Sequence, residues 1–203
     1  MRKLIVSEII SLDGVFQAPG APEEDPLENF RYGGWAAPYD DDALGQAAEA
    51  QFSEPFELLL GRRTYDIFAS FWPHVPAGHP VGDLYNRVRK HVATHHPETL
   101  DWQNSHALDG DLAGAVRALK QNDGADLWTN GSGDMVRQLL AAGLVDELRL
   151  QIFPVLLGPG KRLFDDSARA SAFNLEDSTI TPGGVVLARY VRDGEVRTGT
   201  WGT

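Results

Sequence analysis

The sequence of 203 residues contains no cysteine. This absence excludes a disulfide framework, a cysteine-ligated zinc site, an iron–sulfur cluster and a thiol nucleophile. A chain of this length can bury a core that needs no covalent or metal staple. We therefore expect a single globular domain over residues 1–203, with the reducing cytoplasm as its natural location.

Long hydrophobic runs and positive charge are also scarce. No apolar stretch approaches the ~20 residues that span a bilayer, and the one before Glu8 is too short for a signal-peptide core. Lys and Arg number 18 against 29 Asp and Glu, so the formal net charge is −11. Nucleic-acid binding draws its affinity from a clustered basic face. We therefore expect neither a membrane nor a nucleic acid as partner.

Patterns typical of metal or hydrolase sites are absent too. The acidic runs at residues 23–25 and 40–42 are more typical of solvated loops or helix starts than of metal ligands. None of the six histidines forms the i, i+4 helical pair with Glu that a zinc hydrolase needs. Ser132 does not lie in a Gly-x-Ser-x-Gly elbow. The sequence therefore predicts no metal and gives no support for a hydrolase.

Strand and helix patterns alternate in the first two thirds of the chain and give way to antiparallel hairpins. The predicted strands lie at residues 3–12, 56–60, 91–94, 126–130, 148–157, 173–180 and 185–191. The predicted helices lie at residues 40–52, after 61–64, at 83–88, at 111–121 with Asp111 as N-cap, and around 135–140. This order predicts an α/β fold with one mixed sheet flanked by helices.

Residues 13–38 form a long loop rich in proline and glycine, and long ordered loops tend to be functional. The loop also carries the aromatic residues Phe16, Phe30, Tyr32 and Trp35. Two interpretations stay open: the rings line a ligand cleft, or they fix the loop to the core.

The strongest local signals are two glycine-containing turns, at residues 61–64 and 131–133, each between a predicted strand and a predicted helix. A helix N-terminus offers unpaired N–H groups and partial positive charge, and glycine allows a phosphate to approach closely. Arg62 and Arg63 add cations to the first turn. Neither turn has the spacing of the Rossmann fingerprint or of the phosphate-binding loop. Together they suggest a nucleotide with several phosphates.

Asp13 ends the first predicted strand. Two interpretations stay open here as well. Its carboxyl group is a candidate general acid or substrate-binding group, or it caps the turn that it opens.

Five motifs, in order along nearly the whole chain, carry a family resemblance: residues 11–14, 61–65, 131–133, 143–148 and 154–161. The chain resembles the dihydrofolate reductase superfamily, and most of all the reductase domain of the bifunctional riboflavin-biosynthesis deaminase-reductases and its stand-alone relatives. The resemblance implies a mixed, mostly parallel eight-stranded sheet with flanking helices, NADPH as hydride donor, and a homodimer.

The resemblance also assigns site residues. The matched cofactor-binding positions are Gly61, Arg62, Arg63, Thr64, Gly131, Ser132, Gly133, Asp134 and Met135. Thr94 and His95 stand where relatives often have Ser-Arg to hold the adenosine 2′-phosphate, which leaves NADH as an alternative cofactor. Asn130 stands where riboflavin-pathway reductases carry Glu.

These residues lead to a functional hypothesis. The chain is expected to be an NAD(P)H-dependent oxidoreductase that transfers hydride to a C=N or C=O bond of a small heterocyclic or sugar-like substrate, resembling 5-amino-6-(5-phosphoribosylamino)uracil reductase or dihydrofolate reductase. Asp13 is the expected catalytic residue, and Gly14, Trp35, Tyr39 and Asn130 are the expected substrate-binding residues. The alternative is a member of the same fold that binds a nucleotide or small ligand without catalysis.

Overall fold

A computed structural model describes residues 1–166 and 168–202. Over these ranges the strands are β1 (Leu4–Ser11), β2 (Phe56–Gly61), β3 (Lys90–Ala93), β4 (Ser105–Ala107), β5 (Asp126–Asn130), β6 (Glu147–Phe153), β7 (Ala172–Ile180) and β8 (Val186–Gly194). The α-helices are α1 (Asp42–Gln51), α2 (Arg62–Phe71), α3 (Pro80–Arg87), α4 (Leu112–Gln121) and α5 (Gly133–Ala141). None of the helices in these ranges is long and apolar enough to cross a membrane.

The strands form one eight-stranded sheet in the order β4-β3-β2-β5-β1-β6-β8-β7. β6 pairs antiparallel with β8, and β8 antiparallel with β7, whereas the other neighbours are parallel. The predicted fold class is confirmed: this is a single α/β domain with a mixed, mostly parallel sheet and flanking helices.

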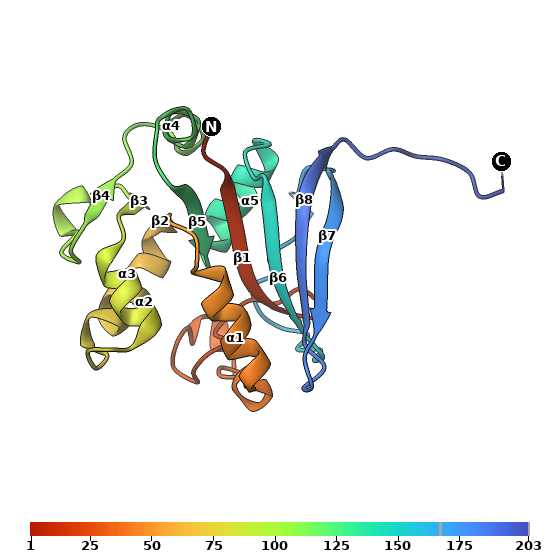
Figure 1. Ribbon diagram of the computed structural model, residues 1–203, viewed down its shortest axis with the longest axis horizontal. Coiled ribbons are helices and arrows are strands. Elements are labelled where there is room, and N and C mark those ends of the chain that lie inside the picture. Colours follow the sequence, from red (N-terminus) through yellow and green to blue (C-terminus); the bar gives the residue numbers. More distant parts are fainter. Residues whose placement is uncertain (167, 203) are drawn as a thin grey trace.

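Helices cover both faces of the sheet because the central strands alternate between two apolar cores. On β1, Leu4 and Val6 pack into one buried cluster with residues of α4 and α5. Ile5, between them, packs into a second cluster with residues of α2 and α3. Figure 1 shows α1 in front of the sheet and α5 behind it. Because β2 and β5 are parallel neighbours, their carboxyl ends lie at the same edge of the sheet, and the turns into α2 and α5 lie there.

Two predicted boundaries need correction. The strand expected over residues 148–157 ends at Phe153, because Pro154 has no N–H to continue the ladder. After it, the carbonyl of Val155 accepts a hydrogen bond from the N–H of Leu12 at 2.8 Å, and Leu156 is 75% exposed. The helix expected from residue 40 begins at Asp42.

The prediction missed one strand and displaced another by one residue. β4 is only three residues long, has no fully buried side chain, and is held by pairing with β3 at the edge of the sheet. β3 ends at Ala93, so His95 and His96 lie after it, outside any strand.

The predicted N-cap of α4 yields a test of local stability. The Asp111 carboxylate accepts a hydrogen bond from the N–H of Gly114 at 2.9 Å. We expect Asp111→Ala to lower the free energy of unfolding by about 1 kcal/mol, and Asp111→Asn by less, because Asn also caps. Urea denaturation measures both. Asp109→Ala, at an exposed position two residues earlier, is the control. If this variant lowered the free energy of unfolding as much as Asp111→Ala does, the capping role would be contradicted.

Candidate functional site

Two helix-opening turns lie side by side at the ends of the neighbouring strands β2 and β5. The N–H of Gly61 donates to Oγ of Ser132 at 2.9 Å. In return, the N–H of Ser132 donates to Oγ1 of Thr64 at 2.8 Å. These reciprocal bonds join the turns at residues 61–64 and 131–133, which the sequence predicted separately, into one structure.

The backbone of the second turn has a left-handed conformation at two successive residues. Gly131 and Ser132 both have positive φ, 70° and 60°. For a serine this conformation costs on the order of 1–3 kcal/mol, and the two hydrogen bonds to the first turn hold it in place. A Cβ at Gly131 would lie only 3.1 Å from Thr64. Helix α5 begins directly after this turn, at Gly133, and the N-terminus of a helix favours an anion.

The joined turns line a cleft of about 370 Å³. Strand β1, the long loop (residues 13–38) and the start of α5 supply its other walls. Of the residues assigned by resemblance, the cleft is lined by Gly61, Arg62, Arg63, Thr64, Asn130, Gly131, Ser132, Gly133, Asp134 and Met135. Asp13, Gly14, Trp35, Tyr39, Thr94 and His95 are not among its lining residues.

Two ion pairs to one buried carboxylate lie at one side of the cleft. Asp25, from the long loop, is 8% exposed. One of its carboxylate oxygens accepts from Nη2 of Arg63 at 2.6 Å and the other from Nζ of Lys161 at 2.8 Å. The acidic run at residues 23–25 was expected to be solvated, and for Asp25 that expectation is wrong. Lys161 lies in a predicted motif, but only the fold brings it to Asp25.

Arg62 points toward the turn that follows β3. Its Nε donates to Asp66 at 2.8 Å, while Nη1 lies 3.4 Å from Oγ1 of Thr94 and 3.3 Å from the carbonyl oxygen of His96. The structure therefore brings Thr94 to the Arg62 side chain. His95 lies next in the same turn and is exposed.

Glu8 is a cleft residue that the sequence reasoning missed. It lies on β1, is 4% exposed and lines the cleft. Burial raises the pKa of its carboxyl group well above the usual value, while a hydrogen bond from the backbone of Gly131 acts in the opposite direction. Its Oε1 atom is buried without a hydrogen-bond partner. The available signal was an acidic residue within an apolar run that was predicted to be buried.

The aromatic residues of the long loop divide between the two interpretations. The Phe16 ring lines the cleft and packs on α5 so closely that a Cβ at Gly133 would lie 2.2 Å from it. Trp35 and Tyr39 instead make edge-to-face contacts with Phe153, at ring-centroid distances of 5.5 and 5.8 Å. Phe30 belongs to the same cluster. The structure places Trp35 and Tyr39 against this cluster and away from the lining of the cleft.

The Asp13 carboxylate organises a turn. It accepts hydrogen bonds from Oγ of Ser11 at 2.6 Å and from the N–H groups of Leu157 and Gly158 at 3.2 and 2.8 Å. Burial alone would raise its pKa, but these hydrogen bonds lower it to about 2. Such a carboxylate is ionised at neutral pH and is a poor proton donor. This geometry matches the turn-capping interpretation.

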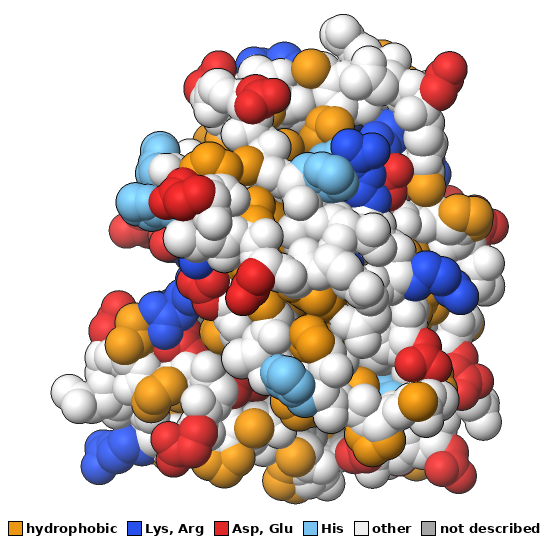
Figure 2. Space-filling model, turned by 90° about the vertical axis from the view of Figure 1, so that its left-hand side faces the viewer, with side chains coloured by type: hydrophobic (Ala, Val, Ile, Leu, Met, Phe, Trp, Pro, Cys, Tyr) orange, Lys and Arg blue, Asp and Glu red, His pale blue; other side chains and the backbone are white. Residues whose placement is uncertain are grey.

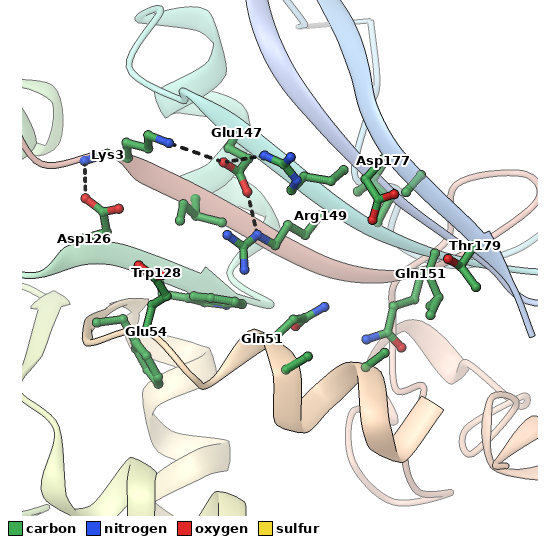
Figure 3. A pocket seen from close by; sticks show the side chains of 18 of the residues that line it. Lys3, Gln51, Glu54, Asp126, Trp128, Glu147, Arg149, Gln151, Asp177 and Thr179 are labelled. Atoms are coloured by element: carbon green, nitrogen blue, oxygen red, sulfur yellow. Dashed lines mark hydrogen bonds and ion pairs between the residues drawn. The ribbon is translucent and has the colours of Figure 1, made fainter. Parts of the chain in front are cut away.

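A second hollow, of about 720 Å³, lies between α1 and strands β5, β6 and β8 (Figure 3). The side chain of Glu147, 2% exposed, faces three cations there: Arg149 at 2.6 Å, Lys3 at 3.9 Å and Arg189 at 3.8 Å. The Arg149 guanidinium also lies over the Trp128 ring at 4.8 Å. None of the site residues assigned from the sequence lines this hollow.

The charge on the surface near β4 is mixed. Figure 2 shows acidic, basic and histidine side chains interspersed on this face, with hydrophobic side chains between them. This face therefore has no extended basic surface of the kind that a nucleic-acid backbone requires.

The sheet order, the joined turns and the cleft define an α/β protein with a cleft at the ends of two neighbouring parallel strands. The chain belongs to the RibD C-terminal domain family, whose family model matches residues 2–187. This membership supports a reductase-like function and confirms the resemblance found in the sequence.

Two relatives from Bacillus subtilis (strain 168) are uncharacterized proteins. YyaP is 31% identical over 136 residues, which cover 66% of this chain and 72% of that protein. YwjB is 27% identical over 192 residues, which cover 94% of this chain and 98% of that protein.

Two solved structures share the fold. A putative riboflavin biosynthesis protein from Shewanella sp. PV-4 matches with a TM-score of 0.63 at 21% identity, covering 94% of this chain and 99% of that one. A pyrimidine reductase-like protein from Corynebacterium diphtheriae matches with a TM-score of 0.59 at 16% identity, covering 97% of this chain and 93% of that one.

The low pKa of Asp13 predicts an acid-sensitive contribution to stability. Because the folded-state pKa lies below the unfolded value, the contribution is complete above the unfolded value and is lost as the pH falls toward 2. We expect Asp13→Asn to be less stable than the wild type at neutral pH, and the difference to shrink between about pH 4 and pH 2. Urea denaturation at several pH values measures it. A difference that does not change with pH would contradict the low pKa.

Proposed function

We propose that the chain is an NAD(P)H-dependent reductase whose dinucleotide binds in the cleft formed by the joined turns. The observation that carries the proposal is the reciprocal hydrogen bonding of Gly61, Thr64 and Ser132, which unites two anion-binding turns. A dinucleotide carries a pyrophosphate, and two helix N-termini with adjacent arginines complement it. The residues present therefore fit the cofactor.

The order of the strands suggests which end of the dinucleotide lies where. The turn at residues 131–133 would hold the pyrophosphate. Arg62 and Thr94, beside β3, would hold the adenosine end and its 2′-phosphate. Because the strand order runs β3-β2-β5-β1, the nicotinamide end would lie over β1. When bound, the dihydronicotinamide supplies hydride, and the protein's part is to orient it and to exclude water.

We propose a small heterocyclic or sugar-like substrate with a reducible C=N or C=O bond. This class is supported by the family membership and by the names of the two structural neighbours, a riboflavin biosynthesis protein and a pyrimidine reductase-like protein. NADPH oxidation with pterin, flavin-precursor and quinone acceptors tests the proposal. Tight cofactor binding without turnover on any acceptor would favour the alternative of a non-catalytic binding protein.

The two arginines are expected to have different roles in cofactor binding. Arg62→Ala should weaken NADPH binding more than NADH binding, because Arg62 faces the proposed 2′-phosphate corner. Arg63→Ala should weaken both. Each charged hydrogen bond lost should cost about 1.5–3 kcal/mol. Fluorescence titration measures the four dissociation constants, and Arg87→Ala, at an exposed position on α3, is the control. Unchanged affinity in both variants would refute the cofactor site.

We also propose a homodimer, as the family resemblance implies. The support in the structure comes from two exposed leucines, Leu12 at 60% and Leu156 at 75%. They lie close together because the N–H of Leu12 bonds the carbonyl of Val155 at 2.8 Å. Burying such side chains is favourable.

Light scattering at micromolar concentration tests the homodimer. We expect twice the 22.2 kDa chain mass, and a shift toward the single-chain mass in a Leu12→Ser/Leu156→Ser double variant. A wild type that gives the single-chain mass at every concentration would show that the dimer is wrong.

A further inference from the structure

Glu8 brings a buried side-chain oxygen without a hydrogen-bond partner to the lining of the cleft. Over residues 1–166 and 168–202, five buried side-chain atoms lack a hydrogen-bond partner: Glu8 Oε1, Trp72 Nε1, Ser105 Oγ, Trp128 Nε1 and Thr129 Oγ1. Of these five residues, Glu8 alone lines the cleft of the joined turns. The cleft cations are already paired, Arg62 with Asp66 and both Arg63 and Lys161 with Asp25. A buried polar atom without a partner is costly, so this oxygen points to a ligand.

The surroundings of Glu8 favour the uncharged acid. Register places Leu150 of β6 beside it, and the backbone of Gly131, at the end of β5, hydrogen-bonds to its carboxyl group. No cation is among the groups that shift its pKa, which burial raises. A charged carboxylate here would also repel a phosphate in the adjacent turn. The neutral acid instead offers an O–H donor.

We propose that Glu8, as a neutral acid, donates a hydrogen bond to the carboxamide oxygen of the nicotinamide and so positions that ring. The inference rests on the proposed function. With the adenosine end at Arg62 and the pyrophosphate at residues 131–133, the remaining end of the dinucleotide reaches β1, where Glu8 lies. The carboxamide oxygen is a hydrogen-bond acceptor at that end of the dinucleotide, and the neutral acid supplies the matching donor. Glu8 is therefore a positioning residue that sets cofactor affinity and its pH dependence.

Other titratable groups surround the same cleft. Tyr85 interacts electrostatically with Glu8. The charged residues that line the cleft beside Glu8 are Glu24, Asp25, Glu28, Arg62, Arg63, Asp134, Arg137 and Lys161. The experiment must separate Glu8 from these groups, so it compares two ligands that share the phosphates.

The test measures the affinity of NADPH relative to 2′-phospho-ADP-ribose, a fragment that lacks the nicotinamide. Isothermal titration gives both dissociation constants for the wild type, Glu8→Gln and Glu8→Leu. Both ligands carry the same phosphates. Titration of the phosphates, and of the groups that contact them, therefore changes both dissociation constants equally and leaves their ratio unchanged. Because burial raises the pKa of Glu8, the pH series starts at about 5 and extends to about 9.5, well above the usual titration range of a carboxyl group.

We expect the NADPH preference of the wild type to fall as the pH rises through the pKa of Glu8. Glu8→Gln keeps a donor at every pH, so its preference should be retained and independent of pH. At low pH, the preference of Glu8→Leu for NADPH should be about 2- to 12-fold smaller than that of the wild type, which is the equivalent of one neutral hydrogen bond. If Glu8→Leu does not fold, the contrast between the wild type and Glu8→Gln still decides the matter.

Several results would overturn the inference, and they differ from failure of the proposed function. A pH-independent preference in the wild type, or a full preference in Glu8→Leu, would refute the role of Glu8 while leaving dinucleotide binding intact. If Glu8→Leu weakened the binding of NADPH and of 2′-phospho-ADP-ribose equally, Glu8 would contact a part that the two ligands share. That result would also refute the contact with the carboxamide. If the wild type binds neither ligand, the proposed function itself fails.

Discussion

The site depends on the hydrogen bonds that join two turns from distant parts of the chain. Ser132 is central: its hydroxyl accepts from Gly61, and its N–H donates to Thr64. The pairing of β2 with β5 brings these residues together, and the bonds hold Ser132 in a left-handed conformation that is unfavourable by itself. Joined in this way, the two turns line one cleft.

The long loop completes the cleft in two ways: its carboxylate pairs with cations of the cleft, and one of its aromatic rings covers the start of α5. Asp25 is held between Arg63 and Lys161, and the Phe16 ring lies on the start of α5. A buried carboxylate between two cations is satisfied in charge and in hydrogen bonding, which fixes this part of the loop against the turns. The other end of the loop is fixed by apolar contacts, chiefly Trp35 against Phe153. One segment thus serves both as a wall of the site and as part of the core.

The difference between Asp13 and Glu8 shows how environment, more than residue type, decides the chemistry of a carboxyl group. Asp13 follows a strand and receives several hydrogen bonds from a turn, so it is ionised. Glu8 is inside the same strand, has an oxygen without a partner, and is favoured as the neutral acid. Sequence reasoning chose Asp13 because it adjoins a glycine turn within a motif. It passed over Glu8 because an acidic residue in an apolar run has no recognisable motif.

The sequence by itself determined the α/β class, the two glycine-containing turns between strand and helix, and the family, because these depend on local periodicity, on glycine at strand ends and on motifs in a fixed order. Tertiary structure alone decided that β4 pairs at the edge, and that Trp35 and Tyr39 pack away from the cleft. It also decided the partners of Asp25 and the burial of Glu8. The physical reason is that hydrogen bonds, ion pairs and desolvation act between neighbours in space. Glu8 lies beside Gly131, and Asp25 beside Lys161, only after the chain has folded.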